Sequence, residues 1–376
     1  MRNSRGRSFT ALGALSLLAG VMLWAEPAVA AITPTPDVSL SLPVGTSPWD
    51  VEEGPDGRLY VTDTNNGVVL AYPLDATATT QPVATFHVKD SSLAGIAAVG
   101  LSFAPDGRMF VTNGLGGTVF SFSAADVLNV AGDHDVVADA TTFVINSTVL
   151  DVMFHSTYMY VFAYDLDEIW VYDMTSNLLY MFVQSTTGLN FPTTGVVVGD
   201  QLVVSNNHGI ADGSGMLSWL PLASIEGQGS TTAAPGLNVP ETKRIDSLAS
   251  LSNFTDYVAK DCNDNLIVTN YGGYPAPIYV NKFSPDATID SAPIDSITGD
   301  GTELATAEGV EVDSHDHVWV AQTSGAVLRF DSFADQCDAA ALPNTGENSN
   351  TAWSAVVGAL VLGVAGVTLL RNRRRA

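Results

Sequence analysis

The sequence predicts an all-β fold, a six-bladed β-propeller with four short strands in each blade. Three observations lead to this prediction: a pattern that recurs about every fifty residues, strands that are apolar on both faces, and Asp-Gly turns between strands. A strand that is apolar on both faces must be covered on both sides, as it is between two propeller blades. A single sandwich would leave one face of each strand polar.

The recurring pattern is a tight polar turn followed by a strand that ends in a polar residue. Its two clearest copies contain the dipeptides Asp56-Gly57 and Asp106-Gly107, which suit tight hairpins. The six copies span residues 55–63, 105–113, 156–163, 199–206, 263–270 and 314–322. In the first unit, further strands are expected at residues 49–52, 67–72 and 83–88.

The two ends of the repeat array predict how the ring closes. The last unit offers only three strands, at residues 309–312, 318–321 and 326–330. Residues 37–42 can supply the missing outer strand, because they form a short apolar segment near the start of the chain. This closure leaves no open ring and so removes the exposed ends of a linear array, and we expect one indivisible domain over residues 31–338.

Residues 1–30 have the three parts of a secretory signal peptide. Arg2, Arg5 and Arg7 precede an apolar run over residues 11–24, and the segment closes on Ala28-Val29-Ala30. We expect cleavage after Ala30 or Ala31, with Ala28 and Ala30 forming the small-residue cleavage signal. The alternative is a signal anchor that stays in the membrane, but it would need a longer apolar span.

The last residues resemble the sorting signal of Gram-positive cell-wall proteins. The pentapeptide is Leu342, Pro343, Asn344, Thr345 and Gly346. An apolar run over residues 351–370 and an arginine cluster over residues 371–375 follow, which can halt translocation in the membrane. We expect a spacer and motif over residues 339–346, and a transmembrane segment with a basic tail over residues 347–376.

This resemblance implies two partners, a sortase and peptidoglycan. The sortase thiolate would attack the Thr345 carbonyl, release the chain from Gly346 onward, and pass Thr345 to an amine of the peptidoglycan precursor. The membrane would then hold the protein only as a sorting intermediate. A plain single-span anchor with the same outward topology is the alternative.

The charge balance excludes nucleic acid as a partner. The chain has 15 basic against 40 acidic residues, a formal net charge of −25. Seven basic and two acidic residues lie in the ends expected to be removed, which leaves 8 against 38, a net charge of −30. Phosphate recognition needs a basic surface, whereas this one would attract cations or basic partners. The alternative is a surface charged only for solubility.

The repeat resembles those of the NHL-repeat and gluconolactonase-like groups of six-bladed propellers, over residues 37–333. The matching pattern is Pro-Asp-Gly-Arg, one variable residue, Tyr or Phe, Val, Thr, and Asp or Asn. The resemblance implies the fold but not the activity, because these groups include hydrolases, lyases and binding modules.

Polar residues follow the second strand of each predicted blade, in loops that should share one face of the propeller. This candidate ligand ring consists of Asp63, Asn65, Asn113, Asp165, Asn206, His208, Asn270 and Gln322. Carboxylates and amides around a channel mouth can hold Ca²⁺ or another divalent metal, or hydrogen-bond a sugar. The alternative is that Asn and Asp end strands because they tolerate turn conformations.

The resemblance also implies an enzymatic alternative, a metal-dependent lactonase-like hydrolase or a lyase at the channel mouth. Glu52, Asn206 and Asn270 are the candidates for the Glu, Asn and Asp that hold a divalent metal in gluconolactonase-like proteins. The match is incomplete, because Glu53-Gly54-Pro55 follows Trp49 here, whereas the group has Glu-Gly-Pro before its Trp. His208 and Glu308 are the candidates for the His and Glu of propeller lyases.

Two further polar clusters, His315-Asp316-His317 and residues 261–265, are predicted to be turns on the face opposite the ring. Cys262 and Cys337 should lie on that same turn face in adjacent blades, and export permits a disulfide between them. The chain would then leave the domain from the turn face, and the ring would point away from the wall.

These observations predict a secreted, cell-wall-anchored surface protein whose propeller is an extracellular binding or adhesion module. A glycan, a protein or a small molecule would be its ligand.

Overall fold

The computed structural model describes residues 34–88, 98–128, 132–134, 143–145, 147–185, 188–208, 215–246, 251, 254–271, 278–289 and 291–337. The expected signal peptide with Ala28 and Ala30, the spacer and sorting motif at residues 339–346, and the segment 347–376 lie outside them. Within the described part, no helix is both long and apolar enough to cross a bilayer.

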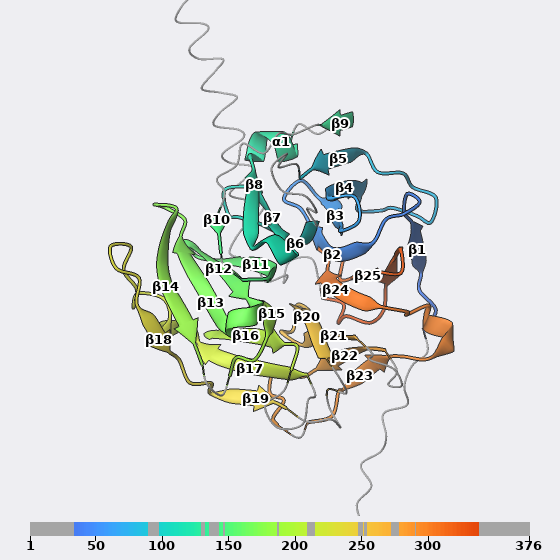
Figure 1. The fold of residues 1–376 in the computed structure, drawn as a ribbon. Coiled ribbons are helices and arrows are strands. Elements are labelled where there is room, and N and C mark those ends of the chain that lie inside the picture. Colours follow the sequence, from blue (N-terminus) through green and yellow to red (C-terminus); the bar gives the residue numbers. More distant parts are fainter. Residues whose placement is uncertain are drawn as a thin grey trace, which may run out of the picture. The chain divides into compact units, whose positions relative to one another are not determined.

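The described strands form six sheets around a common centre, which confirms the predicted six-bladed propeller (Figure 1). Blade 1 contains β2 (Pro48–Glu53), β3 (Arg58–Asp63), β4 (Val68–Pro73) and β5 (Ala84–His87), extended by β9 (Gly132–His134). Blade 2 contains β6 (Ala98–Phe103), β7 (Met109–Asn113), β8 (Thr118–Phe122) and β10 (Phe143–Val144). Blade 3 contains β11 (Val149–His155), β12 (Tyr158–Ala163), β13 (Glu168–Asp173) and β14 (Leu178–Gln184), extended by β18 (Gly236–Asn238).

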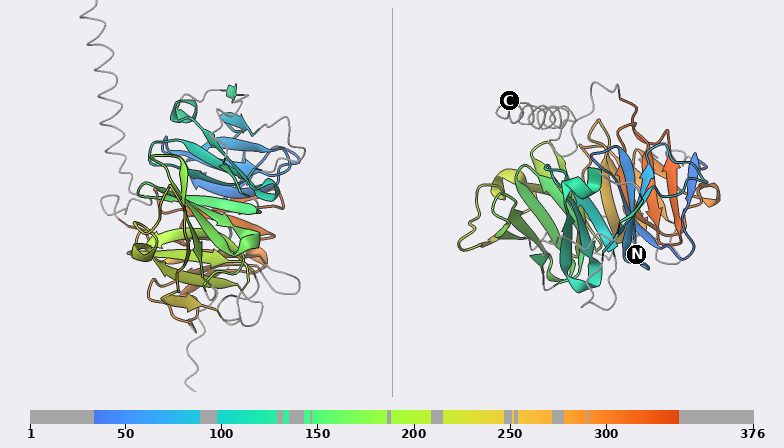
Figure 2. Two further views of the ribbon diagram at one scale, coloured as in Figure 1. Left: turned by 60° about the vertical axis from the view of Figure 1, so that its left-hand side comes forward. Right: turned by 90° about the horizontal axis from the view of Figure 1, so that it is seen from above.

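The other three blades follow in chain order, and Figure 2 shows the sheets packed beside one another. Blade 4 contains β15 (Pro192–Val198), β16 (Gln201–Asn206), β17 (Met216–Pro221) and β19 (Lys243–Ile245). Blade 5 contains β20 (Phe254–Lys260), β21 (Leu266–Tyr271), β22 (Tyr279–Phe283) and β23 (Asp295–Ile297). Blade 6 contains β24 (Ala307–Val312), β25 (Val318–Gln322), β26 (Ala326–Phe330) and β1 (Val38–Ser41).

Helices play a small part in the described fold. One short α-helix, α1 (Ala124–Leu128), follows β8. Four 3₁₀ turns are present, η1 (Gly114–Gly116), η2 (Tyr164–Leu166), η3 (Leu222–Ser224) and η4 (Asp300–Thr302). The short strands β9 and β18, which pair in parallel with the outer strands of blades 1 and 3, were not predicted from the sequence.

The ring closes as predicted, because the strand nearest the N-terminus completes the last blade. β1 pairs antiparallel with β26, and Val38 lies opposite Arg329 while Leu40 lies opposite Val327. Val38 and Leu40 are buried against blade 1 in the cluster that contains Trp319. The first and last described strands therefore pair with each other, and this pairing closes the ring within blade 6.

The core consists of six hydrophobic clusters, one in each interface between neighbouring blades. Between blades 1 and 2, for example, Tyr60, Phe86 and Phe122 are fully buried, and the Phe86 and Phe122 rings meet edge to face. This arrangement explains why the strands are apolar on both faces: each face of a blade is the interior of one cluster.

The threonine of the repeat joins neighbouring blades. Thr62 Oγ1 accepts a hydrogen bond from Asp50 N at 2.8 Å and donates one to Val99 O of blade 2 at 2.7 Å. Thr112 repeats the arrangement one blade later, because its hydroxyl donates to Leu150 O of blade 3 at 3.1 Å. The hydroxyl thus satisfies two backbone groups in the buried inner part of the fold.

We expect Thr62→Val to lower the free energy of unfolding by about 1–3 kcal/mol, because Asp50 N and Val99 O would lose their partner in a buried place. The substitution keeps the side-chain shape, so lost packing contributes little. Urea unfolding of both proteins measures the difference. Thr175→Val, at an exposed turn position, is the control and should change stability by less than about 0.5 kcal/mol. An equal loss of stability in Thr175→Val would contradict a stabilising role for the hydrogen bonds of the Thr62 hydroxyl.

Candidate functional site

The predicted ring residues that end the second strands are buried within their blades. Asp63, Asn113, Asn206, Asn270 and Gln322 are each no more than 2% exposed. Asp63 Oδ1 accepts from Ser47 N at 3.0 Å, and Gln322 Oε1 accepts from Ala305 N at 2.6 Å. Asp63, Asn206 and Gln322 thus bind the segment that leads into the first strand of their own blade, which is a structural role.

The other ring residues lie in the loops. Asn65 Nδ2 donates to Gly45 O at 3.0 Å, and Asp165 Oδ2 accepts from Thr148 N at 3.1 Å. The His208 ring packs edge to face against Phe191 and Phe254, with centroid distances of 5.0 and 4.6 Å. Burial lowers the pKa of His208, so the imidazole is mainly neutral at pH 7. A common ligand for this ring stays a prediction.

The residues proposed for a gluconolactonase-like metal site lie in two different environments. Asn206 Oδ1 accepts from Asn190 N at 2.9 Å, and Asn270 Oδ1 accepts from Asn281 Nδ2 at 3.1 Å. Both amide oxygens therefore accept hydrogen bonds from residues of their own blades. Glu52, in contrast, lies on the innermost strand of blade 1 and lines a central cavity.

This cavity has a volume of about 420 Å³ and is bounded by the innermost strands of all six blades. It reaches from the middle of those strands to the turns that follow them, including exposed Pro105 and Ser314. Each innermost strand has a register irregularity near its start. Such a bulge changes which side chains point toward the centre. Asp50 and Asp151 stand at two of these irregularities.

The deep part of the cavity contains two buried aspartates that bridge neighbouring blades. Asp50 Oδ1 accepts from Val51 N and Oδ2 accepts from Leu101 N of blade 2, both at 2.8 Å. Asp151 Oδ2 accepts from Thr194 Oγ1 of blade 4 at 2.6 Å. Its other oxygen, Oδ1, has no hydrogen-bond partner, although Asp151 is only 6% exposed. An unpartnered buried acceptor is costly, so it indicates a place for a ligand or a proton.

Two glycines make room for these aspartates. A Cβ on Gly309 of blade 6 would lie 2.7 Å from Asp50 Cα, and a Cβ on Gly100 of blade 2 would lie 2.2 Å from the Leu150 carbonyl oxygen. The adjacent blades therefore approach at backbone distance, which only glycine permits.

Two glutamates lie closer to the mouth of the cavity. Glu52 and Glu311 are half-buried, and Glu52 Oε1 accepts from Ser102 Oγ at 3.3 Å. Burial, followed by the charge of Glu311, raises the pKa of Glu52. Burial, followed by the charge of Glu53, raises the pKa of Glu311. Burial also raises the pKa of Asp50 to about 7 and raises that of Asp151.

The basic residues of the cavity lining are already paired. Lys260 Nζ lies 2.6 Å from Asp264, and His155 Nδ1 lies 2.6 Å from Glu226. Among the described residues, these two pairs account for every Lys, Arg and His in the lining. The four carboxyl groups of Asp50, Glu52, Asp151 and Glu311 are therefore left without a basic partner from that lining. We call these four the channel carboxyls.

A second carboxyl pair lies at the starts of two innermost strands. Asp256 of blade 5 and Glu308 of blade 6 lie close enough for the charge of Asp256 to act on Glu308. Asn207 Nδ2 donates to Asp256 Oδ1 at 2.9 Å, and Thr323 Oγ1 donates to Glu308 Oε1 at 3.3 Å. Burial raises the pKa of Asp256 to about 7, and burial with the Asp256 charge raises that of Glu308 to about 9. Glu308 therefore holds its proton at neutral pH.

The His315-Asp316-His317 segment forms a turn, as expected. Asp313 Oδ1 accepts from the backbone N–H groups of His315 and His317 at 2.8 and 2.9 Å, and Oδ2 accepts from Trp319 Nε1 at 2.8 Å. Three side chains of the types that bind metals, His, Cys, Asp or Glu, have ligand atoms within 4.8 Å of one another at one place in the described part of the chain. They are Asp313, His315 and His317. The channel carboxyls do not converge in this way, so this arrangement does not gather three of them around one metal ion.

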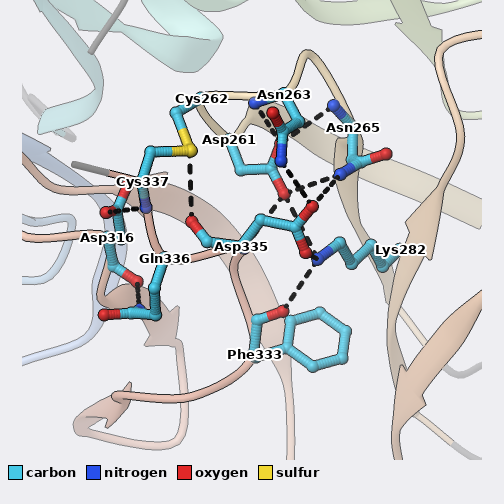
Figure 3. Close-up of a disulfide and its surroundings, with 10 residues drawn as sticks. All are labelled: Asp261, Cys262, Asn263, Asn265, Lys282, Asp316, Phe333, Asp335, Gln336 and Cys337. Carbon is cyan, nitrogen blue, oxygen red and sulfur yellow. Dashed lines mark hydrogen bonds and ion pairs between the residues drawn. A yellow bond between two sulfur atoms is a disulfide. The ribbon is translucent and has the colours of Figure 1, made fainter. Parts of the chain in front are cut away.

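Cys262 and Cys337 form the expected disulfide, with a Cα–Cα distance of 6.3 Å (Figure 3). Beside it, Asp335 accepts hydrogen bonds from Asn263 and Asn265 at 2.8 and 3.0 Å and binds Lys282. These contacts hold the last described residues against blade 5. The Asp261–Asn265 segment is a turn, also as expected, and it provides most of these partners.

From the sequence, Glu52 was a candidate metal ligand, but the channel carboxyls were not expected to form a group. One signal was available, because a strand expected to be covered on both faces should not contain Asp or Glu. Asp50, Asp151, Asp256, Glu308 and Glu311 all break that rule in the first strand of a repeat.

Comparison with known proteins identifies the C-terminus and the fold. Residues 338–376 match the family model of the LPXTG cell wall anchor motif. No curated protein matches the chain.

Solved structures resemble the chain in fold. The WD40 β-propeller domain of Doa1 has a TM-score of 0.51 at 10% identity, over 79% of this chain and 97% of that domain. A streptogramin B lyase has a TM-score of 0.50 at 11% identity, over 77% and 95%. The hydrazine synthase of Kuenenia stuttgartiensis has a TM-score of 0.50 at 10% identity, over 78% and 76%. Proteins of unrelated activity share this architecture, so the likeness indicates the fold alone.

Proposed function

Because the chain is a secreted surface protein that its LPXTG motif anchors to the cell wall, we propose that its propeller is a receptor for a ligand with positively charged amino groups. One observation carries the proposal: the channel carboxyls line a cavity of about 420 Å³ whose own basic residues are paired elsewhere. That volume suits a small organic ligand or the end of a larger one.

An ammonium group suits the chemistry of the cavity. It brings one positive charge and three hydrogen-bond donors to a cavity lined by the four channel carboxyls. Asp151 Oδ1 lacks a donor, and Glu52 and Glu311 are exposed enough to turn toward a ligand. Binding would compensate for the burial of these carboxylates, which is otherwise unfavourable.

The walls of the cavity suit an aliphatic stem beside the amino group. Met153, Val196 and Ala259 occupy the same level of the innermost strands as Glu52 and Glu311, and they line the cavity. A lysine side chain or a polyamine combines such a stem with a terminal ammonium. The arrangement supports a metal-dependent hydrolase less, because the channel carboxyls do not converge on one point.

We expect the folded domain to bind spermidine and to ignore its fully acetylated form, because acetylation removes the positive charges. Isothermal titration calorimetry at pH 8 measures both. Glu311→Gln should weaken spermidine binding at least about tenfold, a loss typical of one buried charge-assisted contact. Asp75→Asn makes the same charge change at an exposed position outside the cavity lining and should leave the affinity within about twofold. Equal weakening by both variants, or binding of the acetylated form, would refute the proposal.

A further inference from the structure

The chain leaves the propeller at the rim of the acidic cavity. Cys262 lines the cavity and is joined to Cys337, the last described residue (Figure 3). Asp316 also lines the cavity, and its Oδ2 accepts a hydrogen bond from Cys337 N at 3.0 Å. The exit point is therefore tied to the mouth by one covalent bond and one hydrogen bond.

The exit segment is held by more than the disulfide. Lys282 is 6% exposed, and its Nζ binds the carboxylates of Asp261 and Asp335. Asp335 N also donates to Asp261 Oδ2 at 3.2 Å. Because Asp335 is bound from several sides, the tether starts from one defined place beside the mouth.

The tether to the wall is short. Thr345, the residue that the sorting motif joins to peptidoglycan, lies eight residues after Cys337. Eight residues span at most about 28 Å when fully extended. The mouth of the cavity is therefore held within that distance of the polymer to which Thr345 is attached.

Peptidoglycan offers the chemistry that the channel carboxyls lack. Its peptides carry free amino groups on short aliphatic stems, and one such amine is the acceptor in sortase anchoring. The net charge of −30 on the mature chain repels anionic polymers, so contact with the wall requires local cationic groups. Tethering raises the effective concentration of nearby amines to the millimolar range, so even a weak intrinsic affinity suffices.

We propose that the channel carboxyls bind free amino groups of the peptidoglycan peptides, so that the propeller docks on the wall with its cavity mouth inward. This inference rests on the proposed function and names the source of the amine. The face that carries Asn65, Asp165 and His208 then points outward, as the sequence analysis expected of it.

The test uses the mature chain, residues 31–345, released from any anchor, and purified Gram-positive sacculi stripped of teichoic acid. Cosedimentation should show binding to untreated sacculi. Acetylation of the sacculus amines with acetic anhydride should reduce the bound fraction at least tenfold, and so should Glu311→Gln. The exposed Asp75→Asn variant should bind like the parent. Glu52→Gln is a second variant if Glu311→Gln does not fold, as judged by circular dichroism.

The two proposals can fail separately. Spermidine binding without sacculus binding overturns the inference and leaves the proposed function standing. Sacculus binding that survives acetylation also overturns the inference, because the amines would not be the ligand. If the mature chain binds neither spermidine nor untreated sacculi, both proposals are overturned. Binding to sacculi that is lost on acetylation and in Glu311→Gln, but retained in Asp75→Asn, supports the inference.

Discussion

Raising the pH from 6 to 9 should lower the free energy of unfolding of the oxidised domain by on the order of 3 kcal/mol. Burial raises the pKa of Asp50 and Asp256 to about 7 and, together with the Asp256 charge, that of Glu308 to about 9. In the unfolded chain these groups titrate near pH 4. The folded state therefore holds more protons than the unfolded state throughout this interval, and stability must fall as pH rises.

The size of this effect follows from the same values. Each group loses about 1.4 kcal/mol of stabilisation per pH unit while it is protonated only in the folded state. In the folded state, Glu308 stays largely protonated over the whole interval, whereas Asp50 and Asp256 are protonated only in its first part. Relaxation of the channel and entry of water reduce the sum, so we expect about half of it. Asp335 has a lowered pKa because of Lys282, but it titrates below this interval and does not oppose the trend.

Urea unfolding at half-unit pH steps measures this dependence. Glu308→Gln removes a group whose pKa is about 9, so the stability of this variant should decline less between pH 8 and 9 than that of the parent. Saturating spermidine should restore stability to the parent at pH 8, because the bound ammonium replaces the lost protons as the partner of the carboxylates. A parent protein whose stability rises with pH would contradict the burial of these carboxyls.

Lys282→Met should lower the free energy of unfolding by about 3–5 kcal/mol, because it leaves a fully buried carboxylate without its cation. The side chain of Asp261 is 0% exposed, and Lys282 Nζ lies 3.2 Å from its Oδ2. Lys282 Nζ also donates to Phe333 O at 3.2 Å, so the exit segment would lose a second contact. Thermal unfolding under non-reducing conditions, followed by urea titration, measures the loss.

Lys260→Met is a matched control in the same blade. Lys260 also pairs with an aspartate, but its partner Asp264 is 39% exposed and can be solvated by water. Pairs of this kind contribute about 0–1 kcal/mol, so this variant should differ little from the parent. Similar losses in the two variants would show that the Asp261 carboxylate does not depend on Lys282.

Several features of the fold could be predicted from the sequence because they depend on local pattern. The turns at Asp56-Gly57 and Asp106-Gly107, the strand β1 that completes blade 6, and the Cys262–Cys337 disulfide were all expected and are all present. Turn chemistry and two-sided hydrophobicity are properties of short segments, so they can be recognised without the fold. The threonine of the repeat was visible as a pattern, but its bonds to the next blade were not.

The candidate site was harder to predict, because polar residues at strand ends have two possible roles. Asp63, Asn206 and Gln322 lie where a ligand ring was expected, but their hydrogen bonds serve the backbone of their own blades. A residue type that favours turns carries no information about what lies across the channel.

By itself, the sequence determined that this protein is exported, anchored to the cell wall through its LPXTG motif, and built as a ring of six repeated blades. Only the tertiary structure decided that Asp50, Asp151 and Glu311 share one cavity and that the exit at Cys337 lies on its rim. The physical reason is ring closure: the innermost strands come from all six blades, so their side chains meet only when the ring is complete. The burial that raises the pKa of these carboxyls then follows from closure as well.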